Sequence, residues 1–313
     1  MKTGAAPRIA YGEKLLELAH SNKDIVALDA DLKNSTMSCL IEEAYPERFF
    51  EMSIAEQNMV ATAAGMALKG KIPFVNTFAV FLTGRAFDQV RQEVAYPALN
   101  VKLCGSSAGL SDFGDGATHQ SVEDMALMRA LPNMIVLSPA DEIETRAMVE
   151  FMVQHNGPVY LRLDRSETPI VLDESYKFEL GKPNVIADGT DVTIFATGRM
   201  VSVALEAAEI LKGSDNISAE IVNVGTVKPM DPQAIQKYAE KTGAVVTVEE
   251  HNVYGGMGSA IAESLMARKI PIVPVGVADR FGQSAKTVEE LFVEYGLTAE
   301  SVALAARKVL TYK

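Results

Sequence analysis

Short apolar runs alternate with longer amphipathic segments along most of the chain. Each run is rich in Val, Ile and Leu and ends in a polar turn, which is typical of strands in a mostly parallel sheet with helices between them. In the first half we expect strands at residues 24–31, 71–78, 100–107, 133–141 and 157–164. Helical periodicity predicts helices at residues 13–20, 55–69, 121–131 and 141–155.

The same alternation begins again in the second half of the chain. Strands are expected at residues 191–198, 219–226, 244–251 and 271–279. Helices are expected at residues 201–211, 231–240, 258–269 and 299–310. The stretch 173–189 has scattered charges and no sustained period, so it indicates a linker. We therefore predict two mostly parallel-sheet α/β domains, at residues 1–172 and 190–313.

Length and charge narrow the class of protein. The 313 residues suffice for two domains of ordinary size, and 48% of them are hydrophobic, as in folded globular proteins. Lys and Arg number 29 against 41 Asp and Glu, a formal net charge of −12. This acidic balance provides no basic surface for nucleic acid or anionic lipid, so neither is expected as a partner.

Cysteine and histidine usage supports neither a disulfide framework nor a metal site. Cys39 and Cys104 do not form a CxxC motif, and the histidines are not clustered. We assign no metal ligand to the chain. No apolar segment has the length of a leader or a membrane span, which predicts a cytoplasmic location and no membrane partner.

The turns after the strands of the first series are the places where chemistry is expected. The carboxyl ends of parallel strands form the ligand crevice of such sheets. Candidate residues in these turns are Asp31, Phe78, Phe81, Ser107, Asp115, His119 and Arg165.

Two short motifs compete for a functional role. Gly105–Gly109 matches the G-x-S-x-G nucleophile elbow, but a glycine-rich loop follows it instead of a helix, which disfavours a hydrolase. Gly255–Gly258 lies between an expected strand and helix, where backbone amides could hold a phosphate. Its spacing departs from G-x-G-x-x-G because Ile261 takes the third position, and close helix–strand packing explains the glycines equally well.

Glu56 begins a helical segment that is almost free of charge, with Ala, Met and Gly on every face. Such a helix is expected to be buried or to lie at a subunit interface. A carboxylate there is unfavourable unless something partners it, which makes Glu56 a candidate acid or base. The plain alternative is that Glu56 caps the helix N-terminus.

Four stretches of the chain resemble the pyrimidine-binding domain of transketolases, and 1-deoxyxylulose-5-phosphate synthase is similar in the same regions. They read SIAEQNMVATAAGMAL, TFAVFLTGRAFDQVRQEV, DFGDGATHQSVEDMALMRALPNMIVLSPAD and GPVYLRLDR. The second series of elements is similar to the transketolase C-terminal domain. The resemblance covers nearly the whole chain, with its motifs in the family's order.

The resemblance implies thiamine diphosphate as the cofactor and ketol transfer as the reaction. Glu56 would hydrogen-bond the aminopyrimidine ring and so help to activate the cofactor. Phe81 matches the aromatic ring that stacks on the aminopyrimidine, with Phe78 one turn earlier, although a phenylalanine pair is also common in cores. Asp31 and Arg85 match further cofactor positions.

The resemblance also implies a set of substrate contacts. His119, a second catalytic residue, and Asp115 match residues that hydrogen-bond sugar hydroxyls and the carbonyl oxygen. Arg8, Ser35 and Arg165 match positions that bind the sugar phosphate, a task suited to guanidinium groups. Ser107 also belongs to the substrate site. It stands where many members have a second histidine, and Gly84 stands where some have an aromatic residue.

The domain that holds the diphosphate in this family does not match any part of the chain. Gly114–Gly116 reads GDG, but the required asparagine does not follow it. The missing domain could belong to a separate subunit or to a longer chain, or this could be a cofactor-free binding module. We predict a C-terminal, β-type subunit of an α2β2 transketolase that acts on sugar phosphates, with Mg²⁺ held mainly by the N-terminal partner subunit. The alternatives are a 1-deoxyxylulose-5-phosphate synthase-like or other ketol-transfer variant, and a catalytically silent regulatory partner.

Overall fold

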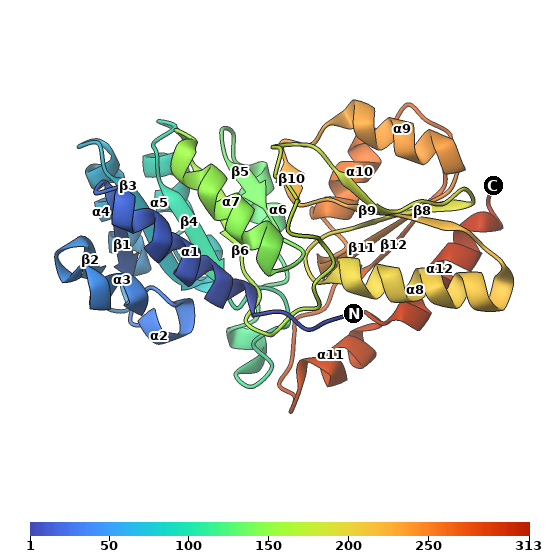
Figure 1. The fold of residues 1–313 in the computed structure, drawn as a ribbon, viewed down its shortest axis with the longest axis horizontal. Helices are drawn as coiled ribbons and strands as arrows, with labels where there is room; N and C mark the ends of the chain where they lie inside the picture. Colours follow the sequence, from blue (N-terminus) through green and yellow to red (C-terminus); the bar gives the residue numbers. More distant parts are fainter.

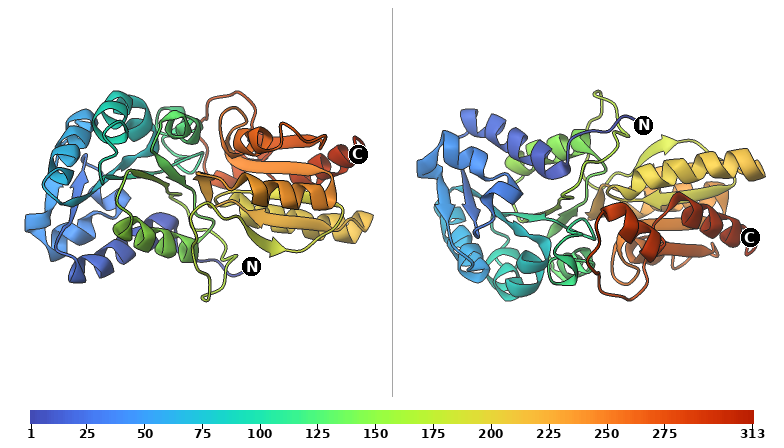
Figure 2. Two further views of the ribbon diagram at one scale, coloured as in Figure 1. Left: turned by 90° about the horizontal axis from the view of Figure 1, so that it is seen from above. Right: turned by 90° about the horizontal axis from the view of Figure 1, so that it is seen from below.

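Two twisted sheets lie side by side, and helices cover both faces of each (Figures 1 and 2). The computed structural model describes residues 1–313. The first half of the chain builds one sheet and most of the second half builds the other, with the C-terminus at the far end of the second unit (Figure 1). The predicted α/β class with mostly parallel sheets is confirmed.

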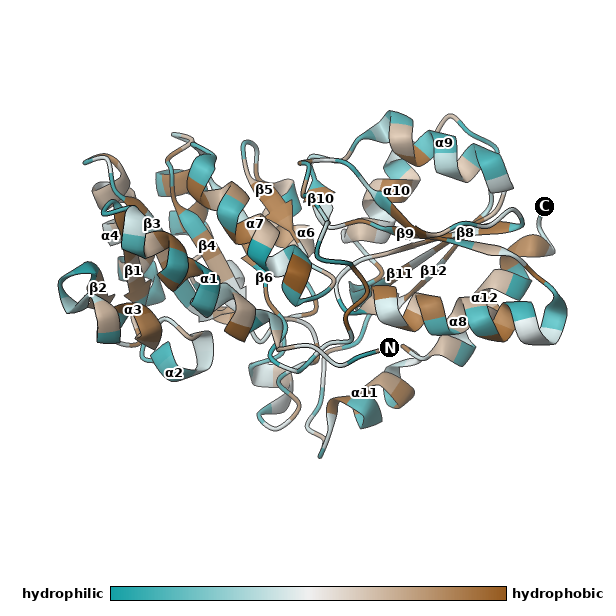
Figure 3. Ribbon diagram, in the orientation of Figure 1, coloured by the Kyte–Doolittle hydropathy of each residue, from teal (hydrophilic) through white to brown (hydrophobic).

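The first sheet has seven strands in the order β10-β5-β6-β4-β3-β1-β2, parallel except for the β10–β5 pair. Its strands are β1 Ile25–Asp29, β2 Phe49–Glu51, β3 Ile72–Phe78, β4 Lys102–Ser106, β5 Ile135–Leu137, β6 Val159–Arg162 and β10 Thr226–Lys228. The central strands are buried on both faces, which explains their continuous apolar runs. Figure 3 shows these strands in brown and the outer helices with teal positions between apolar ones.

Two layers of helices cover the first sheet. Helices α1 Pro7–Ser21 and α7 Glu142–Gln154 pack on one face. The other face carries α4 Glu56–Ala67, α6 Asp124–Ala130 and α5 Phe87–Gln89, the last between the π-helical turns η2 Phe81–Arg85 and η3 Val90–Ala95. Short helical elements complete the unit: α2 Lys33–Thr36, α3 Cys39–Ala44, η1 Pro46–Arg48 and η4 Gly116–Thr118.

The second sheet has five strands in the order β12-β11-β8-β9-β7. They are β7 Asn184–Ala187, β8 Val192–Ala196, β9 Ala219–Asn223, β11 Val245–Asn252 and β12 Ile272–Val277. Helices α8 Met200–Asp215 and α12 Ala299–Leu310 pack on one face, and α9 Pro232–Thr242 and α10 Met257–Ser264 pack on the other. Helix α11 Val288–Tyr295 precedes α12.

Two segments depart from the predicted division of the chain. Residues Asn184–Ala187, expected within the linker 173–189, form β7 and pair with β9 antiparallel. Residues Thr226–Lys228 leave the second unit and pair with β5 of the first sheet. Both are short strands at sheet edges, where pairing to a distant partner decides the conformation more than local periodicity does.

One of the three buried hydrophobic clusters spans both units. Met59 and Leu103 of the first unit belong to the same buried cluster as Phe195, Met257 and Ile261 of the second. This continuity holds the second unit against the first sheet.

Candidate active site

Glu56 is the first residue of α4, and its carboxylate pairs with Arg85. Nη1 of Arg85 lies 2.7 Å from Oε1 and 2.8 Å from Oε2 of Glu56. The Glu56 side chain is 1% exposed, whereas that of Arg85 is 46% exposed. The N-cap position is held by Ala55 without a side-chain cap, so the capping role considered for Glu56 is wrong. Arg85 is the partner that a buried carboxylate requires.

Three aromatic rings pack together, and one of them, Phe81, lies against Arg85 of this ion pair. The rings of Phe78, at the end of β3, and Phe81, in η2, stack with centroids 6.0 Å apart. The imidazole of His119 meets both rings edge-on, at 6.1 Å from Phe78 and 5.3 Å from Phe81. The guanidinium carbon of Arg85 lies 4.5 Å from the centre of the Phe81 ring. The structure thus brings together five of the predicted residues, from three separate parts of the chain.

A second group of predicted residues forms around two arginines. Arg8 donates from Nη1 to the carbonyl oxygen of Ser35 at 2.8 Å and from Nε to that of Arg165 at 3.2 Å. Arg165 donates from Nη1 to Oδ2 of Asp112 at 2.9 Å. Burial, followed by the nearby charge of Arg165, lowers the pKa of Arg8. Two guanidinium groups thus lie close together, and the exposed part of Arg165 is paired on its other side with the buried carboxylate of Asp112. Guanidinium groups in such an arrangement suit an anionic ligand.

Sequence reasoning missed Asp112, and it also missed the buried carboxylate of Asp29, two residues before Asp31. Asp31 is exposed in the turn after β1, with φ 62°. Asp29, in β1, is fully buried and accepts hydrogen bonds from Thr36 Oγ1 at 2.6 Å and Ser38 Oγ at 2.8 Å. Burial raises the pKa of Asp29 to about 6. Asp29 therefore shapes the loop that carries Ser35, and an aspartate inside an apolar strand was the available signal.

The loop after β4 carries the remaining predicted residues. Ser107 is 1% exposed and has φ 53°, a strained conformation of the kind found at functional turns. Asp115 is exposed, and His119 is partly buried with Nδ1 2.9 Å from Thr118 Oγ1. An irregular loop, not a helix, follows Ser107. The buried hydroxyl of Ser107 makes no hydrogen bond to His119, whose Nδ1 bonds Thr118 instead. The nucleophile-elbow alternative is not supported by this geometry.

The glycine-rich loop 255–258 is not available as a phosphate cradle. The amides of Met257 and Gly258 donate to Oε2 and Oε1 of Glu249 at 2.7 and 2.9 Å. Glu249 is buried, and a Cβ at Gly256 would lie 2.1 Å from its carboxylate. The glycines are therefore required by close packing around this carboxylate.

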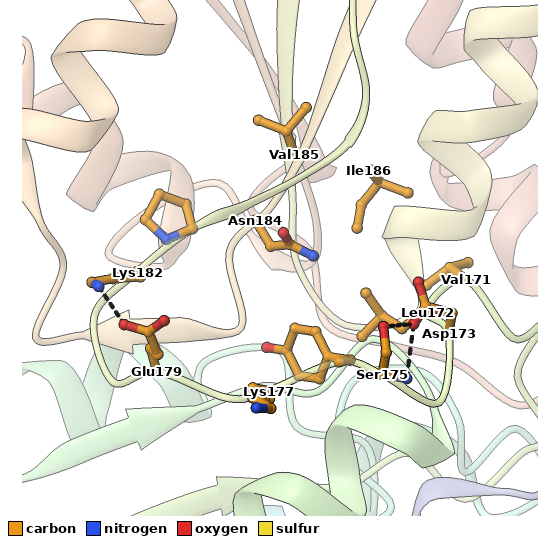
Figure 4. Close-up of a pocket in the computed structure, with 12 residues that line it drawn as sticks. Val171, Leu172, Asp173, Ser175, Lys177, Glu179, Lys182, Asn184, Val185 and Ile186 are labelled. Atoms are coloured by element: carbon orange, nitrogen blue, oxygen red, sulfur yellow. Dashed lines mark hydrogen bonds and ion pairs between the residues drawn. The ribbon is translucent and has the colours of Figure 1, made fainter.

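Other features lie apart from the candidate site. A cavity of about 440 Å³ opens between the linker and β7, beside Tyr176, Lys182 and Asn184 (Figure 4). None of the predicted site residues lines it. No cluster of three or more His, Cys, Asp or Glu side chains is placed to hold a metal ion. The helices include none whose length and apolar character would let it cross a bilayer.

Comparison with known proteins matches both halves of the chain. The family described as transketolase, pyrimidine binding domain, matches residues 4–171, and transketolase, C-terminal domain, matches residues 181–302. A putative transketolase C-terminal section of Methanocaldococcus jannaschii is 45% identical over 95% of this chain and 93% of its own length. The 6-deoxy-6-sulfo-D-fructose transketolase subunit SqwH of Clostridium sp. (strain MSTE9) is 44% identical over 98% of this chain and 95% of its own.

A solved structure shows the same arrangement of both units. It is described as a split-gene transketolase in an inactive β4 tetramer, is 48% identical and superposes with a TM-score of 0.89. The match covers 98% of this chain and 99% of that one.

Proposed function

This chain belongs to the transketolase family, and we propose that it is the C-terminal subunit of a two-chain transketolase. It would transfer a two-carbon ketol unit from an anionic ketose to an aldose acceptor. The observation that carries this proposal is the cluster of Glu56, Arg85, Phe78, Phe81 and His119 at the carboxyl edge of the first sheet.

The residues present suit thiamine diphosphate, on which the family depends. Phe81 is partly exposed, and its ring lies against the Arg85 guanidinium that pairs with Glu56. An aromatic ring and a carboxylate held close together are the combination needed by a flat heterocycle with a ring nitrogen. When bound, the cofactor supplies a thiazolium ring that accepts the electrons released when the bond beside a ketose carbonyl breaks.

The side chains of this subunit would hold and orient the reacting groups. Glu56 would share a proton with the aminopyrimidine ring, and Arg85 keeps the carboxylate in position for this. Phe81 and Phe78 would fix the plane of the ring. His119 lies against the same rings and would hydrogen-bond an oxygen of the sugar.

Arg8 and Arg165 would bind the anionic end of the substrate. The Clostridium relative is named for a sulfonated sugar. Sulfonate and phosphate present similar tetrahedral oxygens, and both match the donor geometry of two guanidinium groups. Ser107 and Asp115 would complete the contacts to the sugar, while Asp31 would add a contact to the cofactor. We propose an anionic ketose as the substrate class on this basis.

An N-terminal partner subunit would provide the diphosphate site and Mg²⁺. The names of the relatives support this division: one is a C-terminal section, one is a subunit, and one structure is a split-gene protein that is inactive as a β4 tetramer. We propose an α2β2 complex in which the cofactor lies between the two kinds of chain.

Reconstitution tests the proposal. This chain is mixed with a diphosphate-domain partner chain, thiamine diphosphate and Mg²⁺, and ketol transfer to ribose 5-phosphate is followed. Xylulose 5-phosphate and 6-deoxy-6-sulfofructose serve as donors, and pyruvate with glyceraldehyde 3-phosphate tests the synthase-like alternative. We expect activity only in the complete mixture and only with the ketose donors. Inactivity with every donor, although the complex forms, would refute the proposal.

A further inference from the structure

We propose that the C-terminal domain is a working part of the active site, because its segment 281–285 positions the loop 110–121 that carries Asp115 and His119. Gln120 is the positioning residue at this contact. The inference rests on the proposed function for its catalytic consequence. In Figure 1 the segment that leads into α11 runs beside the blue-green loop that follows β4.

Gln120 ties the loop to the C-terminal domain from a buried position. It is 3% exposed, and its Nε2 donates to the carbonyl oxygen of Gln283 at 3.1 Å and to that of Asp112 at 3.2 Å. A second bond joins the same two segments, since the amide of Ala285 donates to the carbonyl oxygen of Phe113 at 2.8 Å. The loop is therefore bonded to the other domain on both sides of Asp115.

The contact leaves no space for a side chain at two glycines. A Cβ built on Gly282 would lie 1.7 Å from Oε1 of Gln120. A Cβ on Gly116 would lie 2.3 Å from Oγ of Ser284, and Gly116 also has φ 76°. The backbones of the two domains approach closely here because both positions are glycine.

The second domain also holds the two ends of this loop. Oε1 of Glu250, in β11, accepts from the amide of Leu110 at 2.6 Å. The amide of Asn252 donates to the carbonyl oxygen of Val122 at 2.7 Å. Arg162 Nη2 donates to the carbonyl oxygen of Glu250 at 2.8 Å, which links this joint to β6 of the first sheet. The loop is thus attached at its ends as well as at its tip.

The segment 281–285 is itself firmly attached to α11. The hydroxyl of Tyr295 donates to the carbonyl oxygen of Phe281 at 2.7 Å. The amide of Lys286 donates to Oε2 of Glu290 at 2.9 Å. These bonds hold the segment from both of its ends, so it can act as a support instead of following the loop.

His119 adjoins Gln120 in the chain and packs edge-on against Phe81. Releasing Gln120 would let the His119 imidazole shift relative to the rings beside it. A misplacement of about 1 Å from a distant change can reduce turnover by as much as a hundredfold. The expected effect is therefore on kcat more than on cofactor binding, since Glu56 and Arg85 lie on other elements.

The test uses Gly282→Ala, which changes only the C-terminal domain. The new methyl group displaces the flexible amide of Gln120, and the backbone of Gly282 does not have a positive φ. Gly213→Ala in α8 is the matched control, because a Cβ there meets no atom within 4 Å. Gln120→Ala and the double variant Gln120→Ala with Gly282→Ala complete a cycle.

We expect kcat of the reconstituted complex to fall roughly ten- to a hundredfold in Gly282→Ala and in Gln120→Ala. The double variant should match Gln120→Ala within about twofold, because the displaced amide is already absent. Gly213→Ala should behave as the unchanged protein does. Additive losses in the double variant, or an unchanged kcat in Gly282→Ala, would overturn the inference.

Hydrogen exchange on the isolated chain separates this inference from the proposed function. Amides of residues 110–121 should exchange faster in Gly282→Ala than in Gly213→Ala. If these amides exchange faster in Gly282→Ala but the complex of the unsubstituted chain is inactive, the proposed function is rejected. The contact between segment 281–285 and loop 110–121 would still be established. Equal exchange in the two variants would reject this contact whatever the activity.

Discussion

The two sheets place acidic residues at the same kind of edge and use them in opposite ways. At the carboxyl edge of the first sheet, Glu56 is buried, but its partner Arg85 is half exposed, and Phe81 and His119 beside it are partly exposed. At the end of β11 in the second sheet, Glu249, Glu250 and His251 are all 3% exposed or less. The first edge can receive a ligand, whereas the second is closed.

The two edges differ in the partners that their buried carboxylates bond. The carboxylate of Glu249 accepts hydrogen bonds from the amides of Met257 and Gly258 in the loop 255–258. The carboxylate of Glu250 accepts one from the amide of Leu110. Burial raises the pKa of both carboxyls to about 7. These perturbed groups belong to a structural joint between domains. Strand-end position and a shifted pKa are therefore insufficient to identify a functional site, and an exposed partner is the better criterion here.

The strongest test of this contrast is Glu56→Gln. On the proposed role, in which Glu56 exchanges a proton with the cofactor, its loss should reduce ketol transfer roughly a thousandfold. The midpoint of thermal unfolding should stay close to that of the unchanged chain, since the amide keeps the shape of the side chain. Initial rates of the reconstituted complex and a thermal scan measure the two effects. Near-normal turnover would remove Glu56 from the catalytic assignment.

Arg165→Ala should act on substrate binding at the same open edge. Loss of a charge-assisted bond to an anionic sugar should raise KM for the donor about ten- to a hundredfold, with kcat less affected. Arg268→Ala is the control, because it removes an exposed arginine whose Nε lies 2.7 Å from Oε1 of the likewise exposed Glu240. Steady-state kinetics with phosphorylated and unphosphorylated donors show the effect. An equal rise in KM for an unphosphorylated donor would contradict anion recognition.

Glu249→Gln probes the closed edge. The amides of Met257 and Gly258 donate to different oxygens of Glu249, and a glutamine would replace one of these acceptors by an NH2 donor. The free energy of unfolding should therefore fall by about 2 kcal/mol. Turnover of the folded complex should change little. Urea unfolding at pH 8 measures the loss, with exposed Glu209→Gln as the control. Unchanged stability would mean that the carboxylate does not support the loop.

Glu144 forms a second joint between the units. Its carboxylate accepts from Asn223 in β9 at 2.9 Å and from the hydroxyl of Tyr176 at 2.8 Å. Burial raises its pKa from 4.5 to about 7. The folded protein therefore keeps a proton that the unfolded chain has released, and this stabilisation is lost as pH rises from 4.5 through 7.

Glu144→Gln should weaken that pH dependence. The fall in the free energy of unfolding between pH 5 and pH 8 should shrink by on the order of 2 kcal/mol relative to the unchanged chain. Denaturant titrations at the two pH values give the difference. Exposed Glu150→Gln, on the same helix, is the control. If the free energy of unfolding falls equally between pH 5 and pH 8 in the unchanged chain, Glu144→Gln and Glu150→Gln, another group causes the pH dependence.

Much of the fold could be predicted because the relevant patterns are local. The buried strands are short apolar runs, and the observed helices α4, α7 and α12 fall within or on the expected ranges 55–69, 141–155 and 299–310. Strands β7 and β10 could not be predicted, since each is short, lies at an edge and depends on a partner strand far away in the chain. Helix α11 and the short strand β2 also lay outside the predicted elements.

The sequence by itself determined the α/β class and which residue types are available for chemistry, because alternation of apolar and polar positions and short motifs are properties of neighbouring residues. The tertiary structure alone decided that Arg85 partners Glu56, that Asp112 faces Arg165 and that Glu249 takes the amides of the glycine loop. Each of these is a contact between distant segments. The free energy of a charged group depends on which atoms surround it after folding. Those atoms come from distant segments, so local sequence patterns do not identify them.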